Sequence, residues 1–224
     1  MLQRLRPATA KTQQTSEPER VAESITEGLL RREYSVGQRL IEADLTERLR
    51  VSRSTVREAL KILASRGVVE IVQHRGATIR GLTSTEVGNL LDVLDVLIGL
   101  AARLAAEKID LGDNRLRFRL AAEPLVKSDL PIDIDSALSE RATFYQTMFD
   151  IADSEEVNRA MPTWRAHLFR NQFYAVLTKG DLGAMTGEFR QITGAVLAGD
   201  SVKAEKSARR HLQKTRERVM PYLR

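Results

Sequence analysis

Val51-Ser-Arg-Ser-Thr-Val-Arg-Glu-Ala-Leu-Lys-Ile-Leu-Ala-Ser-Arg66 is the stretch of this 224-residue sequence that decides its fold. Four apolar residues recur along it at the spacing of one helical stripe: Val56, Ala59, Leu60 and Leu63. Ser52 and Ser54 stand just before the stripe, where a hydroxyl can accept a hydrogen bond from a free N–H group of the first turn. The stretch therefore predicts an amphipathic helix with a capped N-terminus.

The polar face of this helix is unusually basic. One acid, Glu58, stands among five cationic residues: Arg50, Arg53, Arg57, Lys61 and Arg66. Short hydroxyl side chains are interleaved with the arginines at the start of the helix: Ser52, Ser54 and Thr55. When such a helix enters a DNA major groove N-terminus first, arginines reach guanine edges or phosphates and hydroxyls hold phosphates. The alternative is an ordinary solvated basic face.

The segments on either side favour DNA binding. Residues 17–33 and 40–49 predict two helices before the basic one, which gives a helix-turn-helix arrangement. Residues 68–73 and 77–80 predict two short strands, joined by a tight turn at His74-Arg75-Gly76. A turn with Gly76 can approach a sugar-phosphate backbone or a minor groove closely, so its residues are candidate contacts. A plain hairpin that only closes a small core is the alternative.

Residues 17–81 resemble the winged-helix domain of GntR-type bacterial transcription factors. The resemblance is carried by three segments: Gly37-Gln-Arg-Leu40, Glu42-Ala-Asp-Leu45 and Val51 to Leu60. It extends to Leu63, to Gly67-Val-Val69 and to the turn His74-Arg75-Gly76. It implies that Arg53 and Arg57 are the chief DNA contacts. By the same resemblance the supporting contacts are Ser52, Ser54, Thr55, His74 and Gly76. Arg75 is a further candidate because it lies at the tip of the predicted hairpin.

Residues 82–224 predict an all-α antiparallel bundle. Thr83-Ser-Thr-Glu86 is typical of a capping box, and the helix that it starts, to about residue 108, is apolar nearly all round. Such a helix is either buried between other helices or contributes to a subunit interface. Since two-fold dimers are the commonest oligomers, we expect it to form a homodimer. Further helices are expected at 113–129, 135–152, 154–177, 182–198 and 201–221, with breaks that include Gly180-Asp181.

This bundle resembles the C-terminal FCD domain of the FadR branch of the family, best over Glu188–Asp200 and on to His211-Leu212. The resemblance implies a place in the bundle core where relatives bind a metal, but only His211 keeps a ligand there. The other aligned positions hold Arg141, Tyr145 and Phe189. One imidazole beside an arginine cannot hold a divalent ion, so we expect no metal and no cofactor. An arginine with two aromatics suits an organic anion; the alternative is that these side chains fill the cavity.

The composition sets further limits. Residues 1–16 carry three basic residues and no acid and predict a disordered tail, residues 17–81 carry 12 basic and 10 acidic residues, and residues 82–224 carry 20 of each. The positive excess is thus confined to the part expected to meet DNA. There is no cysteine, and no run of 18 apolar residues free of charge. We therefore expect a cytoplasmic protein without a membrane span.

The rival functions are an enzyme and a helical ligand-binding protein with no DNA role. The sequence shows no phosphate loop, nucleophile elbow or metal-ligand pair. Asp92 and Asp95 lie close on the first bundle helix, but solvated acids commonly have this spacing. We therefore expect a mainly α, dimeric transcription regulator, and by resemblance to this branch it is most often a repressor. Residues 17–81 are expected to bind an inverted-repeat operator. Residues 82–224 are expected to bind an anionic organic effector and to form the dimer.

Overall fold

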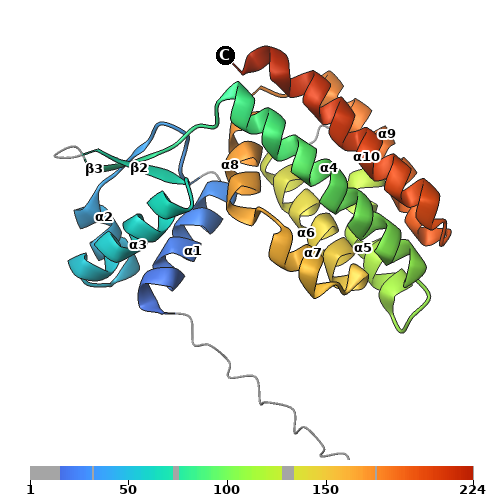
Figure 1. Cartoon of the computed structure of the whole chain (residues 1–224), viewed down its shortest axis with the longest axis horizontal. Helices are drawn as coiled ribbons and strands as arrows, with labels where there is room; N and C mark the ends of the chain where they lie inside the picture. Colours follow the sequence, from blue (N-terminus) through green and yellow to red (C-terminus); the bar gives the residue numbers. More distant parts are fainter. Residues whose placement is uncertain (1–15, 32, 73–75, 128–133, 175, 224) are drawn as a thin grey trace, which may run out of the picture.

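The computed structural model describes residues 16–31, 33–72, 76–127, 134–174 and 176–223. Figure 1 shows a smaller N-terminal part with three helices and a sheet, beside a larger part made of helices only. The predicted fold class, a mainly α chain with a winged helix-turn-helix and an all-α bundle, is confirmed. No helix among the described residues is long and apolar enough to cross a membrane.

Three helices form most of the N-terminal part: α1 (Glu17–Leu30), α2 (Glu42–Leu49) and α3 (Arg53–Ser65). Helix α1 begins with the expected Ser16 cap, which forms a capping box with Glu19. Helix α1 ends at Leu30 rather than at residue 33. Helix α2 begins two residues later than predicted, because Arg39 and Leu40 pair with the sheet instead.

The sheet has three strands: β1 (Arg39–Leu40), β2 (Val69–Val72) and β3 (Gly76–Ile79). They pair antiparallel in the order β1-β3-β2, with Val69 opposite Ile79 and Arg39 opposite Thr78. The two predicted strands are confirmed. Strand β1 was not predicted, because two residues are too few to show an alternating pattern.

The predicted stripe of α3 is the core of the winged-helix part. Val56, Ala59 and Leu63 are completely buried, and Leu60 is almost so. They pack with buried residues of α1, such as Ile25 and Leu29. This burial fixes which face of α3 stays outside, and so it places the basic residues in solvent.

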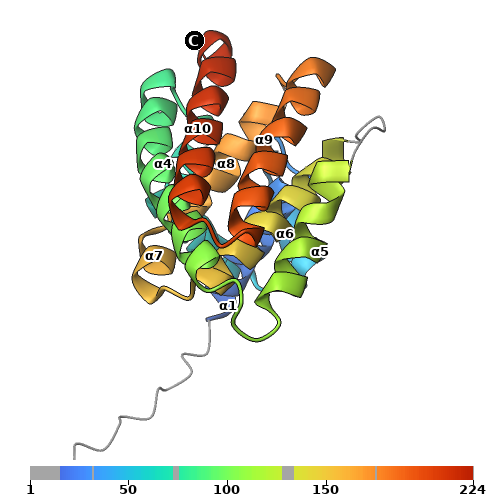
Figure 2. The ribbon, with the colours of Figure 1, turned by 90° about the vertical axis from the view of Figure 1, so that its right-hand side faces the viewer.

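The bundle contains α4 (Ser84–Glu107), α5 (Asn114–Lys127), α6 (Ile134–Ala152), α7 (Glu155–Ala160), α8 (Thr163–Tyr174), α9 (Lys179–Leu197), α10 (Ser201–Val219) and the short 3-10 helix η1 (Met220–Tyr222). Figure 2 shows α4 beside α10, and α9 between α10 and the pair α5 and α6. The α4 helix begins at the predicted Thr83–Glu86 capping box.

Two of the predicted helix boundaries in the bundle are wrong. The helix expected at 154–177 is divided into α7 and α8, because Pro162 holds the preceding Met161 in an extended conformation (ψ 120°). The break expected at Gly180-Asp181 lies instead inside the first turn of α9. There Thr178 caps the helix and Asp181 completes a capping box, so the polar residues start the helix rather than interrupt it.

Helices α4 and α10 approach each other closely. A Cβ atom at Gly99 would lie 2.7 Å from Cγ of Arg209, so the contact depends on the glycine. Arg209 Nε donates to Asp95 Oδ2 at 2.9 Å, and Arg216 Nη1 lies 2.8 Å from Asp92 Oδ1. The two acids that could have suggested a catalytic carboxylate pair therefore form interhelical ion pairs.

Helix α8 connects the bundle to the winged-helix part (Figure 1). The amide of Asn171 donates to the backbone oxygens of Leu29 (2.8 Å) and Tyr34 (3.2 Å) at the end of α1. The Gln172 amide bonds both backbone groups of Leu82, in the linker before α4. One helix thus holds both the winged-helix part and the linker.

Candidate DNA-binding surface and effector site

The N-terminus of α3 is capped as predicted, and its hydroxyl groups form a cluster. Ser52 Oγ accepts a hydrogen bond from the Thr55 backbone N–H at 3.1 Å. It also lies 2.7 Å from Ser54 Oγ and 2.8 Å from Thr55 Oγ1. Thr55 in turn donates to Glu17 Oε2 at the start of α1. The three hydroxyl side chains are thereby ordered at the positive end of the helix dipole, where anions bind favourably.

Both arginines predicted to contact DNA lie on the exposed side of α3. Arg57 Nε donates to both oxygens of Glu42 in α2, at 2.9 and 3.2 Å, and the Arg57 side chain stays 66% exposed. Sequence reasoning missed Glu42 as a partner of this surface. This partner could have been inferred from the predicted helix-turn-helix, because that arrangement packs the start of α2 against α3.

The wing is only partly described. His74 and Arg75, both predicted contacts, lie outside the described residues. Gly76 begins β3 with φ of +85°, a left-handed conformation that favours glycine. Arg39 of β1 passes beside it, since a Cβ atom at Gly76 would lie 3.6 Å from Arg39 Nε. Arg39 adds an exposed cation to the sheet that sequence reasoning did not include.

The four residues predicted to bind an effector converge in the bundle core, although they come from three helices. Arg141 Cζ lies 5.1 Å from the ring centre of Phe189 and 6.0 Å from that of Tyr145. The rings of Phe189 and His211 are 4.9 Å apart. All four side chains are buried. The aromatic rings also contact each other and Phe144 edge to face.

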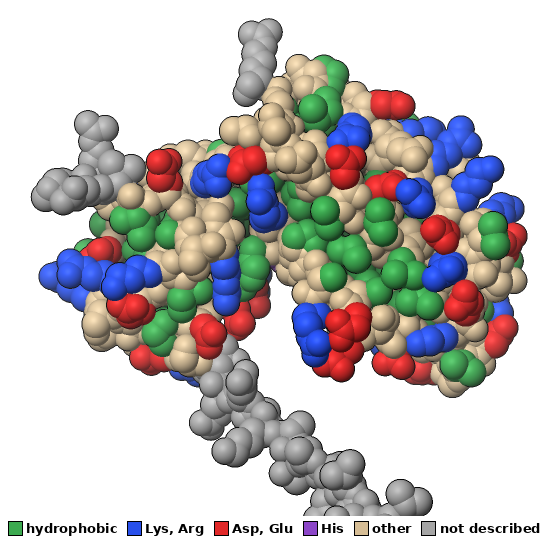
Figure 3. Space-filling view, in the orientation of Figure 1, with side chains coloured by type: hydrophobic (Ala, Val, Ile, Leu, Met, Phe, Trp, Pro, Cys, Tyr) green, Lys and Arg blue, Asp and Glu red, His purple; other side chains and the backbone are tan. Residues whose placement is uncertain are grey.

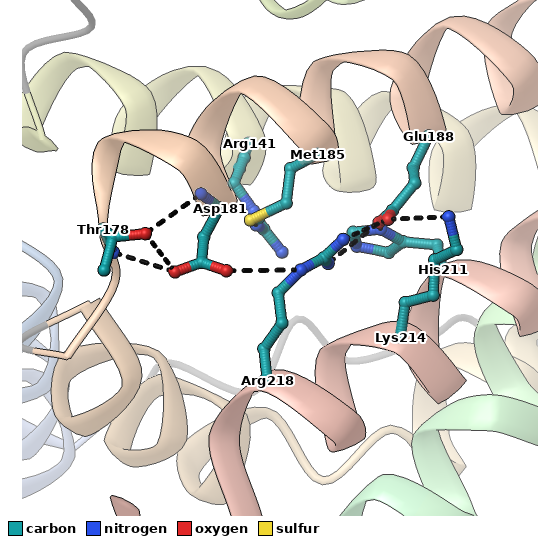
Figure 4. A network of polar contacts seen from close by, with 8 residues as sticks. All are labelled: Arg141, Thr178, Asp181, Met185, Glu188, His211, Lys214 and Arg218. Atoms are coloured by element: carbon teal, nitrogen blue, oxygen red, sulfur yellow. Dashed lines mark hydrogen bonds and ion pairs between the residues drawn. The ribbon is translucent and has the colours of Figure 1, made fainter.

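A fifth residue, Glu188, was missed by sequence reasoning and is the centre of a buried polar cluster (Figure 4). Glu188 Oε2 lies 2.6 Å from His211 Nδ1 and accepts from Arg218 at 3.1 Å. Glu188 Oε1 accepts from Arg218 and lies 3.5 Å from Lys214 Nζ. Its sequence signal was an acid at helical spacing with the apolar residues Met185 and Ile192, which are also buried on α9.

Burial and charge set the protonation states in this cluster. Burial alone would raise the pKa of Glu188, but hydrogen bonds from His211 and Arg218 outweigh it and lower this pKa to about 2. Burial lowers the pKa of His211 to about 4, against the opposing hydrogen bond to Glu188. Near neutral pH His211 is therefore an uncharged imidazole that donates from Nδ1 to an ionised Glu188. Its Nε2 is buried without a hydrogen-bond partner among the described residues.

These residues do not fit the metal site of the FCD resemblance. Arg218 donates to both Glu188 oxygens, so this carboxylate is already neutralised by a cation. Asp181, the other carboxylate in Figure 4, bonds to Thr178 and lies 3.7 Å from Arg218 Nε. Arg141 adds a further positive charge beside them, which disfavours a cation. The described residues also contain no group of three or more His, Cys, Asp and Glu side chains placed to hold a metal ion.

A capped basic helix beside a sheet, joined to a helical bundle with a buried polar centre, defines the class of DNA-binding transcription regulators with an effector domain. Family models agree with this class. Residues 18–79 match the model of "Bacterial regulatory proteins, gntR family", and residues 89–214 match that of the FCD domain. The chain belongs to the GntR family and carries an FCD domain, so it is a DNA-binding transcription regulator rather than an enzyme.

Similar proteins are named accordingly. An uncharacterized HTH-type transcriptional regulator of Mycobacterium tuberculosis is 28% identical, over 90% of this chain and 89% of its own length. A probable D-xylose utilization operon transcriptional repressor of Paenarthrobacter nicotinovorans is 26% identical, over 79% of this chain and 77% of its own. The solved structure of McbR/YncC from E. coli superposes with a TM-score of 0.75 at 18% identity, over 89% of this chain and 94% of its own.

Proposed function

We propose that this regulator is a homodimeric repressor whose two winged helices bind an inverted-repeat operator, and whose bundle responds to a small organic effector. The observation that carries the proposal is the ordered N-terminus of α3, with exposed Arg53 and Arg57 beside a hydroxyl cluster. We assign base or phosphate contacts to these arginines and supporting contacts to Ser52, Ser54, Thr55, His74, Arg75 and Gly76. The repressor name of the Paenarthrobacter relative supports the direction of control.

The domain division follows the same logic. We assign DNA binding to residues 17–81, and effector binding and dimerisation to residues 82–224, in the cytoplasm where the operator lies. Figure 3 supports the dimer, because apolar side chains gather on the face of the bundle over α4. Val93 and Val96 of α4 are about half exposed, and Leu100 continues the same face. A two-fold axis through this face would cover it on both subunits.

The effector site that we propose is the cluster of Arg141, Tyr145, Phe189 and His211. The Arg141 guanidinium, held between two aromatic rings, suits a carboxylate with an apolar body. His211 Nε2 presents a lone pair, which suits a hydroxyl or amide donor on the same ligand. The alternative is that Tyr145 and Phe189 simply fill the core. Phe189→Ala separates the two: a filled core loses roughly 3–5 kcal/mol of stability, whereas a pocket wall loses little and changes the effector response.

The function is tested with the full-length protein and labelled DNA from upstream of its own gene, at several salt concentrations and with a panel of organic acids. We expect saturable binding that weakens steeply with salt, because phosphate contacts release counterions. We also expect at least one acid to change the apparent affinity. Arg119→Ala on exposed α5 is the matched control for Arg57→Ala. Binding that is insensitive to salt, or equal in both variants, contradicts the proposal.

A further inference from the structure

A groove lies between the two parts of the molecule, on the side of α8 that faces α1 and α6. It has a volume of about 520 Å³ and is lined by residues of all three helices. A second hollow of about 360 Å³ adjoins it and shares Glu27, Thr163 and His167 with it. Volumes of this size accommodate a small metabolite. Of the residues assigned a role above, Tyr145 also lines this groove, whereas Arg141, Phe189 and His211 do not.

The charges of the groove are divided between the two parts. On the winged-helix side α1 contributes the carboxylates of Glu23 and Glu27. On the bundle side α8 contributes the guanidinium of Arg170, which lies 5.6 Å from the ring centre of Tyr145. Buried Phe149 supplies apolar surface between them. Arg31 Nη2 donates to Glu27 Oε2 at 3.2 Å, so Glu23, Glu27 and Arg31 together leave one net negative charge on the α1 wall. A ligand that complements the two walls carries a positive group toward α1 and a negative group toward α8.

His167 adds a hydrogen-bonding group between the two walls. It lines both hollows, and its Nδ1 atom is buried without a hydrogen-bond partner among the described residues. Burial, with a smaller contribution from Arg170, lowers the pKa of His167 to about 4. The imidazole is therefore uncharged near neutral pH and can either donate or accept one hydrogen bond. A buried polar atom without a protein partner is expected to meet a water or a ligand.

We propose that this groove binds a small zwitterion of the α-amino acid class. Its carboxylate pairs with Arg170, its ammonium group pairs with Glu27 and Glu23, and its side chain lies on Phe149. The groove shares Tyr145 with the cluster around His211, and Arg141 and Arg170 lie 6.0 and 5.6 Å from the centre of its ring. The ligand-pairing groups of the groove, Arg170, Glu27 and Glu23, are not part of that cluster.

Ligand binding at this place is coupled to the position of the winged-helix part. The walls belong to both parts, so the affinity for the ligand depends on how they are placed, and the ligand in turn favours one placement. Helix α8 carries the groove residues Thr163 and His167 on the same short segment that holds α1 and the linker through Asn171 and Gln172. Arg66, just after α3, also stacks on Trp164 of α8 at 4.2 Å. This coupling rests on the proposed function, whereas ligand binding itself does not.

The first test is calorimetric titration of the full-length protein with each of the twenty common L-amino acids. We expect saturable binding of at least one of them, weakened about tenfold or more by Arg170→Gln and by Glu27→Gln, since each removes one charge-assisted pair. Arg119→Gln and Glu107→Gln change exposed charges away from the groove and should bind like the parent. Absence of binding by all twenty, or equal binding by Glu27→Gln, overturns the proposal even if Arg170→Gln proves unstable.

A second titration tests the two charges of the ligand. The methyl ester of the bound amino acid lacks the carboxylate, and its N-acetyl derivative lacks the ammonium group. We expect both to bind at least about tenfold more weakly than the parent amino acid. If the ester binds equally well, the groove is a site for simple amines and the zwitterion assignment is wrong. The converse result with the N-acetyl derivative would make it a site for simple anions.

The coupling is tested by hydrogen exchange and by DNA binding. The amino acid should slow amide exchange in α1 and α8 of the parent, and not in Glu27→Gln. It should also change affinity for the upstream DNA in the parent alone. Ligand binding without any DNA binding would refute the proposed operator function but leave the groove site intact. Ligand binding with unchanged exchange in α1 would refute the coupling.

Discussion

Two arginine–carboxylate pairs in this molecule differ chiefly in their exposure. Arg57 and Glu42 meet on the winged-helix surface, where their side chains are 66% and 33% exposed. Arg218 and Glu188 meet in the bundle, where the corresponding values are 14% and 5%. Water and phosphate can reach the first pair and compete for the arginine, whereas the second pair is largely withdrawn from solvent. The same chemical pair is thus replaceable in one place and structural in the other.

The energetic consequences are opposite. An exposed ion pair contributes little to stability, because water screens it and the side chains lose freedom in forming it. A buried pair also contributes modestly as a whole, but the loss of one partner leaves an uncompensated charge out of water. The predictions below test this contrast in order of decreasing effect.

The largest effect is expected for Glu188→Ala. The change leaves Arg218, Lys214 and His211 around an empty anion position, so the free energy of unfolding should fall by about 3–5 kcal/mol. Chemical denaturation of the full-length protein measures it, with exposed Glu107→Ala as the control. A loss below about 1 kcal/mol would mean that Glu188 contributes no more to stability than an exposed acid, and would contradict the prediction.

The second prediction concerns pH. His167 and His211 have folded-state pKa values of about 4, below the ordinary 6.5. The contribution of each histidine to the free energy of unfolding is therefore at its maximum above pH 6.5. As pH falls from 6.5 toward 4, the unfolded chain binds protons that the folded chain does not. Stability should then decrease by up to about 1.4 kcal/mol per pH unit for each histidine.

His167→Gln should remove about half of this slope, measured as the denaturation midpoint at each pH. Below pH 4.5 the ionised Glu188, with its pKa of about 2, adds a further loss as pH falls toward 2. Equal slopes in parent and variant would mean that folding does not lower the pKa of His167.

The third prediction concerns the exposed surface. Arg53→Ala and Arg57→Ala should each lose about 1–3 kcal/mol of operator affinity, while the melting temperature stays near that of the parent. Fluorescence anisotropy with upstream DNA measures the affinity. A folded variant that binds as tightly as the parent would show that its arginine is not a contact.

The smallest effect is expected for Glu42→Gln. Loss of this exposed pair should change stability by less than about 1 kcal/mol, in contrast to Glu188→Ala. Operator affinity should rise slightly, because Arg57 no longer has to leave a carboxylate. If Glu42→Gln lost as much free energy of unfolding as Glu188→Ala, exposure would not explain how the two pairs differ.

Features that depend on residues close in the sequence were predicted better than those that join distant residues, for a physical reason. Helix α3, its Ser52 cap and its buried stripe depend on neighbours within a few positions, and all were confirmed. The Glu188 cluster joins residues 23 and 30 positions apart, on two helices whose relative rotation no local pattern gives. The convergence of Arg141, Phe189 and His211 was reached only through the family resemblance.

Local signals also failed where two interpretations share the same residues. Gly180-Asp181 contains typical turn residues, yet with Thr178 it forms the start of α9. Strand β1 is too short to leave a pattern, and it exists because β3 offers an edge for Leu40 to pair with Ala77. The interdomain groove follows from the docking of α8 on α1, which depends on hydrogen bonds such as that from Asn171 to Leu29.

The carboxylate of Glu42 gives Arg57 a counterion that belongs to the protein itself. Phosphates occur along all genomic DNA, and a regulator that binds them strongly without sequence specificity is mostly bound away from its operator. In the proposed complex the Arg57 Nε group exchanges the Glu42 carboxylate for DNA, so random phosphates gain little over the partner already in place. Exchange of the Glu42 carboxylate for DNA becomes favourable only where a guanine edge accepts two hydrogen bonds from Arg57 as well. In the proposed complex the pair therefore weakens binding to random DNA, at the cost of a small part of the operator affinity.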